Sequence, residues 1–336
     1  MAGSRANPTL LDQHAGEPFI FGFEFRDGSA RLLTWDEAQA VPASGGGWRW
    51  LHFNINEPDA RKWIREKSGI PMSAANALLA GETRPRVTTF GDGLAVNLRG
   101  VNLNEGAEPE DMVSVRIWID QKRMITARMR NLRATHDIRD AIVDGYAPAG
   151  PGALLSRIAQ RLAERIHPFI EEIEDEVDGL EDAMLSGEGA RVRGQLADTR
   201  HDAVLLRRYI APQRDALIRL ANDECALFDP ATRAELHETA DAVTRHTESI
   251  DAARERAMVL QDQLTDQRAE EMNRNMMILS IVAAIFLPLG FITGLFGINV
   301  GGMPGIDSAA AFWLVVAACA VVGGALLVLF KYLDWL

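Results

Sequence analysis

The longest uninterrupted run of apolar residues lies in the last quarter of the chain, between residues 275 and 306. It contains no Asp, Glu, Lys, Arg or His, and a second uncharged run follows from 309 to 330. About 20 helical residues cross the hydrocarbon core of a bilayer, so each run is long enough to span a membrane. The pattern favours membrane spans over buried helices of a soluble core. It predicts transmembrane helices at about 276–297 and 309–330, a loop at 298–308 and a tail at 331–336.

A long helical pattern leads into the first of these runs. No Pro or Gly interrupts residues 231–287, and positions three and four apart form a heptad register. The register consists of Leu236, Ala240, Val243, Thr247, Ile250, Arg254, Ala257, Gln261, Leu264, Arg268 and Glu271. A single helix over 231–296 would be about 100 Å long. The sequence therefore predicts a stalk helix at 231–297 that continues into the first span.

Residues 151–230 predict an antiparallel pair of helices. Apolar residues recur at steps of three and four from Leu154 to Met184, which is typical of one buried helix face. The face consists of Leu154, Ile158, Leu162, Ile166, Phe169, Ile173, Val177, Leu180 and Met184. The opposite face carries an acidic run at 171–182. Ser186 and Gly187 end this helix, and a second helix is predicted at 190–221.

Residues 1–150 alternate between short strand-like and helix-like segments, which predicts a mixed α/β domain. The expected strands lie at 18–25, 30–35, 48–55, 86–90, 94–101, 112–119 and 123–130. Helices are expected at 59–68 and 72–80, and a third would start at Thr135 as its N-cap and end near Gly145. Along 48–55, Trp48, Trp50 and His52 would share one face. The Gly/Pro cluster at 147–152 marks the end of the domain.

Charge and composition narrow the class of protein. The net charge is −12, and residues 151–275 hold 26 acidic against 16 basic side chains. Such an acidic body argues against nucleic-acid binding. Arg268, Arg274 and Lys331 flank the two spans, whereas the loop between them has no Lys or Arg. The positive-inside rule therefore places both termini in the cytoplasm. No enzyme motif such as a phosphate-binding Gly loop or HExxH is present.

The turn after the first span carries the motif Gly297-Ile298-Asn299. Gly and Asn both favour helix C-caps, so the tripeptide alone is compatible with a plain helix end. Placed at the end of the first of two C-terminal spans, it resembles the CorA superfamily of divalent-metal transporters, most of whose magnesium members carry Gly-Met-Asn. The segments FLPLGFITGLFGINVGGMPG at 286–305 and LLRRYIAPQRDAL at 205–217 resemble the ZntB zinc-transport branch of that superfamily.

This resemblance implies a homopentameric funnel in a bacterial inner membrane, with an α/β cytosolic domain on a helical stalk. It implies transport of Zn²⁺, and of Cd²⁺, Ni²⁺ or Co²⁺, by proton-coupled uptake. Five Asn299 amide oxygens would accept hydrogen bonds from a hydrated cation. The implied pore-lining residues are Asn273, Met276, Ser280, Ala283 or Ala284, Leu287 and Gly290. Asp307 is a candidate proton or metal site at the mouth, because residues 275–306 hold no titratable group.

Several alternatives remain open at this point. A CorA-like Mg²⁺/Co²⁺ channel, a zinc efflux protein, and a membrane-anchored sensor or scaffold all fit the two spans; an enzyme does not. No cofactor is expected besides the transported metal, although the acidic run at 171–182 could bind a regulatory divalent cation. His237 and Asp241 are four residues apart but lack a third ligand, so His237, His136 and His201 are expected to be surface residues.

Overall fold

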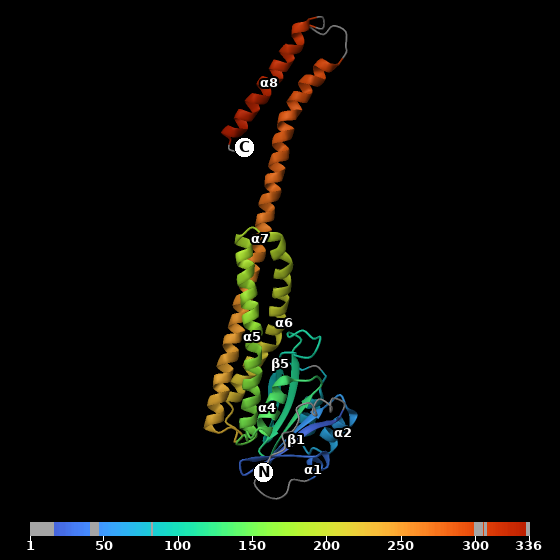
Figure 1. Ribbon diagram of the computed structural model, residues 1–336, viewed down its shortest axis with the longest axis vertical. Coiled ribbons are helices and arrows are strands. Elements are labelled where there is room, and N and C mark those ends of the chain that lie inside the picture. Colours follow the sequence, from blue (N-terminus) through green and yellow to red (C-terminus); the bar gives the residue numbers. More distant parts are fainter. Residues whose placement is uncertain (1–16, 41–46, 82, 299–304, 306–307, 334–336) are drawn as a thin grey trace. The chain divides into compact units, whose positions relative to one another are not determined.

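The computed structural model describes residues 17–40, 47–81, 83–298, 305 and 308–333. Two compact units divide the chain, an N-terminal unit at 1–259 and a C-terminal unit at 260–336. Each is described by itself below (Figure 1).

A seven-stranded sheet forms the centre of the N-terminal unit. Its strands are β1 (Phe19–Arg26), β2 (Ser29–Leu32), β3 (Trp48–Asn54), β4 (Arg86–Phe90), β5 (Gly93–Gly100), β6 (Val113–Asp120) and β7 (Arg123–Arg128). They are ordered β2-β1-β3-β7-β6-β5-β4. The central β3–β7 pair is parallel, whereas the other neighbours are antiparallel.

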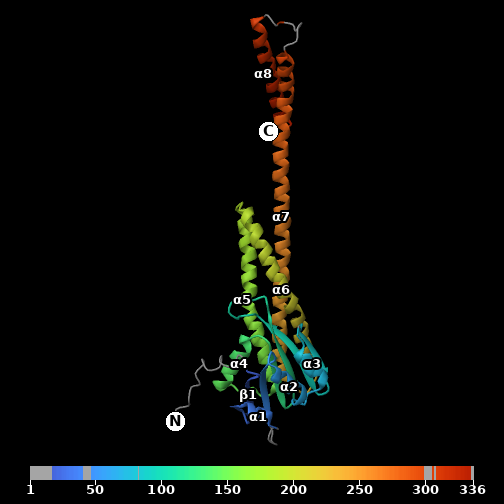
Figure 2. The same ribbon diagram turned by 90° about the vertical axis from the view of Figure 1, so that its right-hand side faces the viewer.

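Helices cover both faces of this sheet (Figure 2). On one face, α1 (Trp35–Gln39), α2 (Pro58–Glu66) and α3 (Met72–Leu79) enclose a core with Leu51 and Phe53 of β3. On the other face lie α5 (Pro151–Leu185) and α6 (Gly189–Ala221), with α4 (Arg133–Val143) packed beside α5. Trp50 and His52 point to this second face. There Thr126 Oγ1 lies 2.8 Å from Trp50 Nε1 and 2.7 Å from His52 Nδ1. The predicted α/β class and the alternation along β3 are confirmed.

The first part of α7 (Pro230–Gly297) completes the N-terminal unit by packing along α5 and α6. Arg256 of α7 forms ion pairs with Asp178 and Glu181 of α5, and Arg207 of α6 pairs with Asp251 of α7. The acidic run on α5 is therefore partly used to hold helices together. The two antiparallel helices that the sequence predicts become, with α7, a three-helix packing.

Five local predictions need correction. His136, expected at the surface, is buried in α4. The predicted strand at 30–35 ends at Leu32, and α1 follows because Thr34 and Glu37 form a capping box. Thr135 does not cap α4: Leu132 occupies the N-cap, and Thr135 Oγ1 donates to its carbonyl oxygen at 2.7 Å.

The other two corrections concern helix faces. Ile170 is buried in α5 where Phe169 was expected, and Phe169 is half-buried. In α7, the small Ala253 is buried where the heptad register placed Arg254, whose guanidinium instead reaches Asp251 at 3.1 Å. A charged side chain at the edge of a helix contact turns to a carboxylate rather than into the apolar interior.

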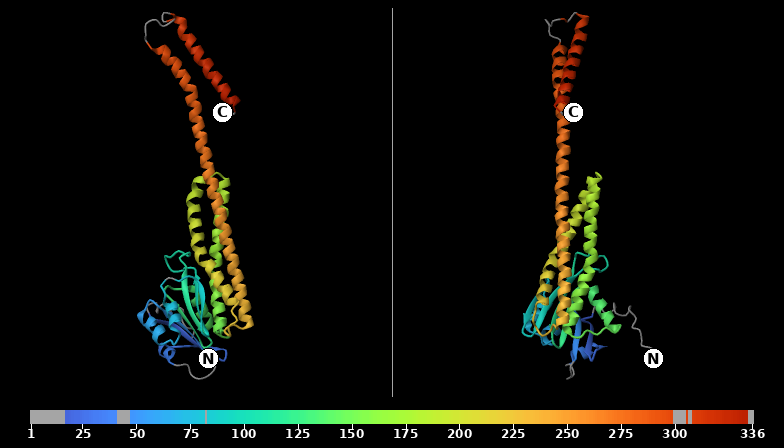
Figure 3. Two further views of the ribbon diagram at one scale, coloured as in Figure 1. Left: turned by 180° about the vertical axis from the view of Figure 1, so that it is seen from behind. Right: turned by 90° about the vertical axis from the view of Figure 1, so that its left-hand side faces the viewer.

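The C-terminal unit consists of the rest of α7 and of α8 (Ala309–Tyr332) (Figure 3). Both helices are long and apolar enough to cross a membrane, judged by length and composition. One side of α7 is buried or half-buried, and Leu289 on this side lies against α8, where a Cβ at Gly323 would be 3.8 Å from Leu289 Cδ1. This side carries Ile281, Ile285, Pro288, Leu289 and Ile292.

Candidate functional site

The residues expected to line a pore occupy the opposite side of α7. A helix turns about 100° per residue, which places all five within about 100° of one another and away from the side that packs on α8. They are Asn273, Met276, Ser280, Leu287 and Gly290, and all are exposed. Leu287 is 78% exposed, whereas Ile281 on the packed side is 5% exposed. The structure thus brings these residues to one face of one helix; that this face lines a pore stays a prediction.

Pro288 interrupts the backbone ladder of α7 in the middle of this stretch. It has no N–H to donate to Ala284, and Thr293 Oγ1 donates to the Leu289 carbonyl oxygen at 3.0 Å one turn later. An open groove of about 850 Å³ lies beside the proline. It is lined by Ala283, Phe286, Leu287, Pro288, Gly290 and Phe291. These apolar side chains offer no ligand to a bare ion, so an ion passing this level would keep its water.

The turn motif begins at the end of α7. Gly297 is the last residue of the helix, as the sequence predicts, and Ile298 follows with an exposed side chain. Asn299 and Asp307 lie outside the described residues. Their predicted roles in selectivity and at the mouth stay predictions.

A second site of interest is a groove of about 1080 Å³ between α5 and α7 in the N-terminal unit. His167 of α5 and His246 of α7 stack in it, with ring centroids 5.4 Å apart and planes 12° from parallel. His167 Nε2 lies 3.4 Å from Glu171 Oε1. Among the described residues, His246 Nδ1 is buried without a hydrogen-bond partner. Burial, helped by the nearby charges of His167 and Arg245, lowers the pKa of His246 to about 4.

The sequence prediction missed this pair, because residues 167 and 246 are far apart in the chain and only the packing of α5 on α7 brings them together. The acidic run at 171–182, by contrast, is divided among partners. Besides the two carboxylates that pair with Arg256, Glu176 accepts a hydrogen bond from Thr199 Oγ1 at 2.9 Å. In the part of the chain that the structure describes, no group of three His, Cys, Asp or Glu side chains is placed to hold a metal.

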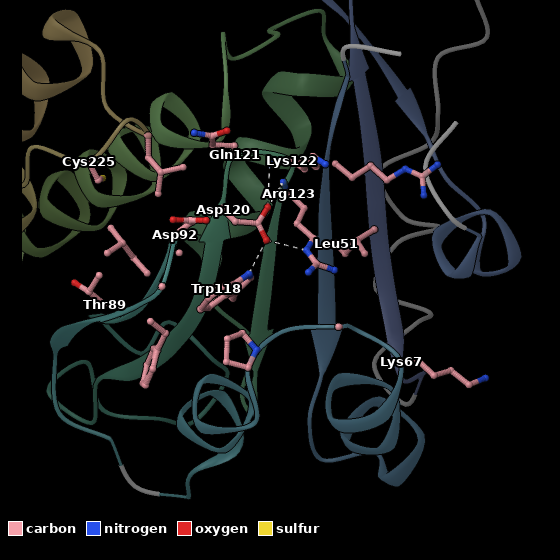
Figure 4. A pocket seen from close by; sticks show the side chains of 18 of the residues that line it. Leu51, Lys67, Thr89, Asp92, Trp118, Asp120, Gln121, Lys122, Arg123 and Cys225 are labelled. Atoms are coloured by element: carbon pink, nitrogen blue, oxygen red, sulfur yellow. Dashed lines mark hydrogen bonds and ion pairs between the residues drawn. The ribbon is translucent and has the colours of Figure 1, made fainter. Parts of the chain in front are cut away.

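A third cavity, of about 870 Å³, lies at one end of the strands, beside the β6–β7 turn (Figure 4). Its central carboxylate, Asp120, already accepts hydrogen bonds from Trp118 Nε1 at 2.9 Å, Lys122 N at 2.9 Å and Arg123 Nε at 3.0 Å. A carboxylate with this many donors shapes the β6–β7 turn and offers little to a ligand. Cys225, on the opposite wall, has a thiol whose pKa is raised by burial, so it is a poor nucleophile.

Comparison with known proteins decides the family. A family model described as CorA-like Mg²⁺ transporter protein matches residues 45–331. The chain belongs to this family. The predicted CorA resemblance is thereby confirmed, while the meaning of the Gly-Ile-Asn variant stays a prediction.

Similar proteins cover most of this CorA-family chain. The divalent cation transporter CmaX of Pseudomonas aeruginosa is 39% identical over 292 residues, 85% of this chain and 87% of the relative. The zinc transport protein ZntB of Pectobacterium carotovorum is 35% identical over 287 residues, 85% of this chain and 88% of the relative.

Solved structures agree with the fold of the CorA-family chain. The full-length CmaX structure has a TM-score of 0.81 at 35% identity and covers 96% of this chain and all of its own. The ZntB cytoplasmic domain of Vibrio parahaemolyticus has a TM-score of 0.67 at 26% identity, covering 75% of this chain and 99% of its own. The CorA magnesium transporter of Methanocaldococcus jannaschii, at 20% identity and a TM-score of 0.79 over 94% of this chain and 99% of its own, shows the fold alone.

Proposed function

We propose that this CorA-family protein transports Zn²⁺ across the bacterial inner membrane. The observation that carries the proposal is the similarity to ZntB proteins over 85% of the chain at 35% identity. The uncharged, exposed face of α7 supports it, because a pathway without charged or thiolate ligands lets a hydrated dication pass without being held.

The mechanism follows from the side chains of that face. Asn299 would accept hydrogen bonds from the water shell of the ion, and Leu287 and Met276 would form apolar constrictions that close by losing water. The subunits would assemble as a homopentamer, so that five copies of α7 surround the axis. Both termini would lie in the cytoplasm, because Arg268, Arg274 and Lys331 flank the spans on that side.

Uptake coupled to protons is the direction that we propose. Residues 275–306 contain no titratable side chain, so a proton would have to be carried by Asp307, by the hydrated metal or by groups of the N-terminal unit. Zinc efflux would use the same pathway with the opposite gradient.

A CorA-like channel for Mg²⁺ or Co²⁺ is the second candidate. The family description names Mg²⁺, and CmaX is named as a divalent cation transporter without a stated metal. Isoleucine for methionine in the turn motif replaces one apolar side chain by another, which gives no chemical reason to prefer zinc. A membrane-anchored sensor or scaffold would need no pathway at all.

Metal flux into liposomes carrying the purified protein tests these proposals. We expect zinc flux that rises with an imposed pH gradient and is abolished by Asn299→Ala. Cys319→Ala, in α8, serves as the control and keeps its flux. Zinc flux that does not change with the imposed pH gradient, with Mg²⁺ passing equally well, would support the channel. No flux of any metal would support the sensor or scaffold.

A further inference from the structure

The cavity beside the β6–β7 turn has the size and the lining of a small-molecule site. Its volume of about 870 Å³ lies within the roughly 300–1,000 Å³ that is usual for such sites. Buried apolar side chains form part of its lining, among them Leu51, Leu94 and Trp118. Lys67 and Cys225 lie on opposite sides of it (Figure 4). The cavity thus lies between turns of the sheet and the loop that joins α6 to α7.

Two arginines that line the cavity hold its walls in place. Arg49 donates a hydrogen bond to the Ala40 carbonyl oxygen at 2.8 Å and pairs with Glu24 at 2.8 Å. Arg123 donates to the carbonyl oxygen of Ser68, next to the wall residue Gly69. Both guanidinium groups are therefore already paired, and they keep the cavity formed without a ligand.

The β6–β7 turn leaves polar groups uncommitted at this cavity. The side chains of Gln121 and Lys122 make no hydrogen bond or ion pair with another described residue, and the same holds for Thr89 at the end of β4. Lys67 Nζ has one long contact, 3.5 Å from Gln39 Oε1. A few unpaired polar groups around apolar walls are the usual means by which a pocket orients a ligand.

The charge of the lining favours an anion. Four of the described lining residues are basic and two are acidic, in a chain whose net charge is −12. Of the two carboxylates, Asp120 already accepts several hydrogen bonds, which leaves the exposed Asp92 against the ammonium groups of Lys67 and Lys122. A locally basic cavity on an acidic protein attracts anions to that place.

We propose that this cavity binds a small organic anion. Its carboxylate or phosphate group would be held by Lys122 and Gln121, and its apolar part would lie against Leu94 and Trp118. An ammonium group binds either kind of anion as a point charge, so the two chemistries share one site. A single inorganic ion would leave most of the volume and the apolar lining unused. This inference does not depend on the proposed zinc transport.

The position of the cavity connects such a ligand to α7. Ala226 and Leu227 line it, and α7 begins shortly after them, at Pro230. This stretch is packed firmly on α5, because a Cβ added at Gly152 would collide with the Leu227 carbonyl oxygen. A bound anion would therefore link the turns of the sheet to the start of the helix that continues into the first span.

Thermal unfolding of the full-length protein in detergent tests the proposal, with phenyl phosphate and phenylacetate as probes. For a Kd of about 1 mM, 10 mM of the probe that binds should raise the Tm by roughly 3–5 °C over sodium chloride at equal ionic strength. Whichever probe gives the larger shift identifies the anionic group. Lys122→Ala should weaken binding about 10-fold and reduce the shift to roughly a third.

Two more variants complete the test. Ala226→Trp fills the cavity from an exposed wall position and should abolish the shift. Lys62→Ala removes an exposed lysine of α2 outside the cavity, so it is the matched control and should respond as wild type does. Because Lys122 is exposed in a turn, Lys122→Ala keeps the test valid even where Ala226→Trp disturbs packing.

Three results would overturn the proposal. The first is a shift from both probes no larger than that from sodium chloride. The second is an equal shift in wild type, Lys122→Ala and Ala226→Trp, which would place the binding elsewhere. The third is an equal shift from inorganic phosphate, which would indicate a plain ion without an apolar part.

Discussion

Asp137 of α4 links the α/β part of the N-terminal unit to α5, and replacing it should show how much this contact contributes to the free energy of unfolding. Its carboxylate accepts hydrogen bonds from Arg161 Nε at 2.8 Å and from Arg165 Nε and Nη2 at 2.6 and 2.7 Å. The Asp137 side chain is 22% exposed. Hydrogen bonds to charged groups contribute about 1.5–3 kcal/mol when shielded, and exposed ion pairs about 0–1 kcal/mol.

Because both arginines are partly exposed, we expect Asp137→Ala to lower the free energy of unfolding by about 2 kcal/mol. A unit of this size loses roughly 2–4 °C in Tm per kcal/mol, so the melting temperature should fall by roughly 4–8 °C. Thermal unfolding of the purified wild type and variant measures this fall in melting temperature. Asp140→Ala is the matched control, because Asp140 lies on the same helix, is 57% exposed and, within the described residues, pairs with the adjacent Arg139.

The same carboxylate predicts a pH dependence. Burial alone would raise the pKa of Asp137, but the hydrogen bonds from Arg165 and Arg161 outweigh burial and lower it below its ordinary value of 3.8. A lowered folded-state pKa stabilises the protein above the unfolded pKa, and this contribution is lost as pH falls through the folded pKa. The Tm difference between wild type and Asp137→Ala should therefore be full at pH 7 and shrink below about pH 4. Equal shifts for Asp137→Ala and Asp140→Ala, or a difference that does not shrink as the pH is lowered from 4, would refute the reasoning.

Two further comparisons use matched residues. Gly179→Ala in α5 meets open space and should raise the free energy of unfolding by about 0.5–1 kcal/mol, because alanine favours helix. Gly93→Ala would drive a Cβ into the Trp118 ring and should lower the free energy of unfolding by about 1–3 kcal/mol, as denaturant unfolding can show. Leu287→Ala, at the exposed face of α7, should raise metal flux several-fold without changing Tm, whereas Leu289→Ala should lower Tm by loosening the contact with α8.

A destabilised Gly179→Ala would mean that α5 makes contacts there that a single chain does not show. Equal effects of the two leucine variants on flux and Tm would mean that the faces of α7 are assigned wrongly.

Much of the fold could be predicted because local patterns determine it. The strands expected at 18–25, 48–55, 86–90, 94–101, 112–119 and 123–130 match β1, β3, β4, β5, β6 and β7 to within two residues, and the uncharged runs mark the last part of α7 and α8. The short helix α1 was missed, since five residues carry little periodicity. Its Thr34–Glu37 capping box was nevertheless present in the sequence as a Thr-x-x-Glu pattern.

Other features depend on distant packing and left no local signal. A heptad register cannot tell whether Ala253 or Arg254 meets the next helix, because both lie near the same edge and the partner decides. Nothing in the residues around His167 or His246 indicates that they stack. The candidate pathway was predictable as a face of one helix, but its lining role depends on an assembly of chains, which the pattern along one helix does not reveal.

The parallel pairing of β3 with β7 has a consequence for how the protein is made. Roughly 70 residues separate the ends of these strands, so at 5–20 residues per second the ribosome needs about 4–15 s to supply β7 after β3. During that interval β3 presents an open, apolar strand edge at what becomes the middle of the sheet. Both predicted spans are synthesised only later, so a nascent chain has finished its sheet before the membrane can receive it. Chaperones that shield strand edges would therefore act on this protein ahead of the insertion machinery.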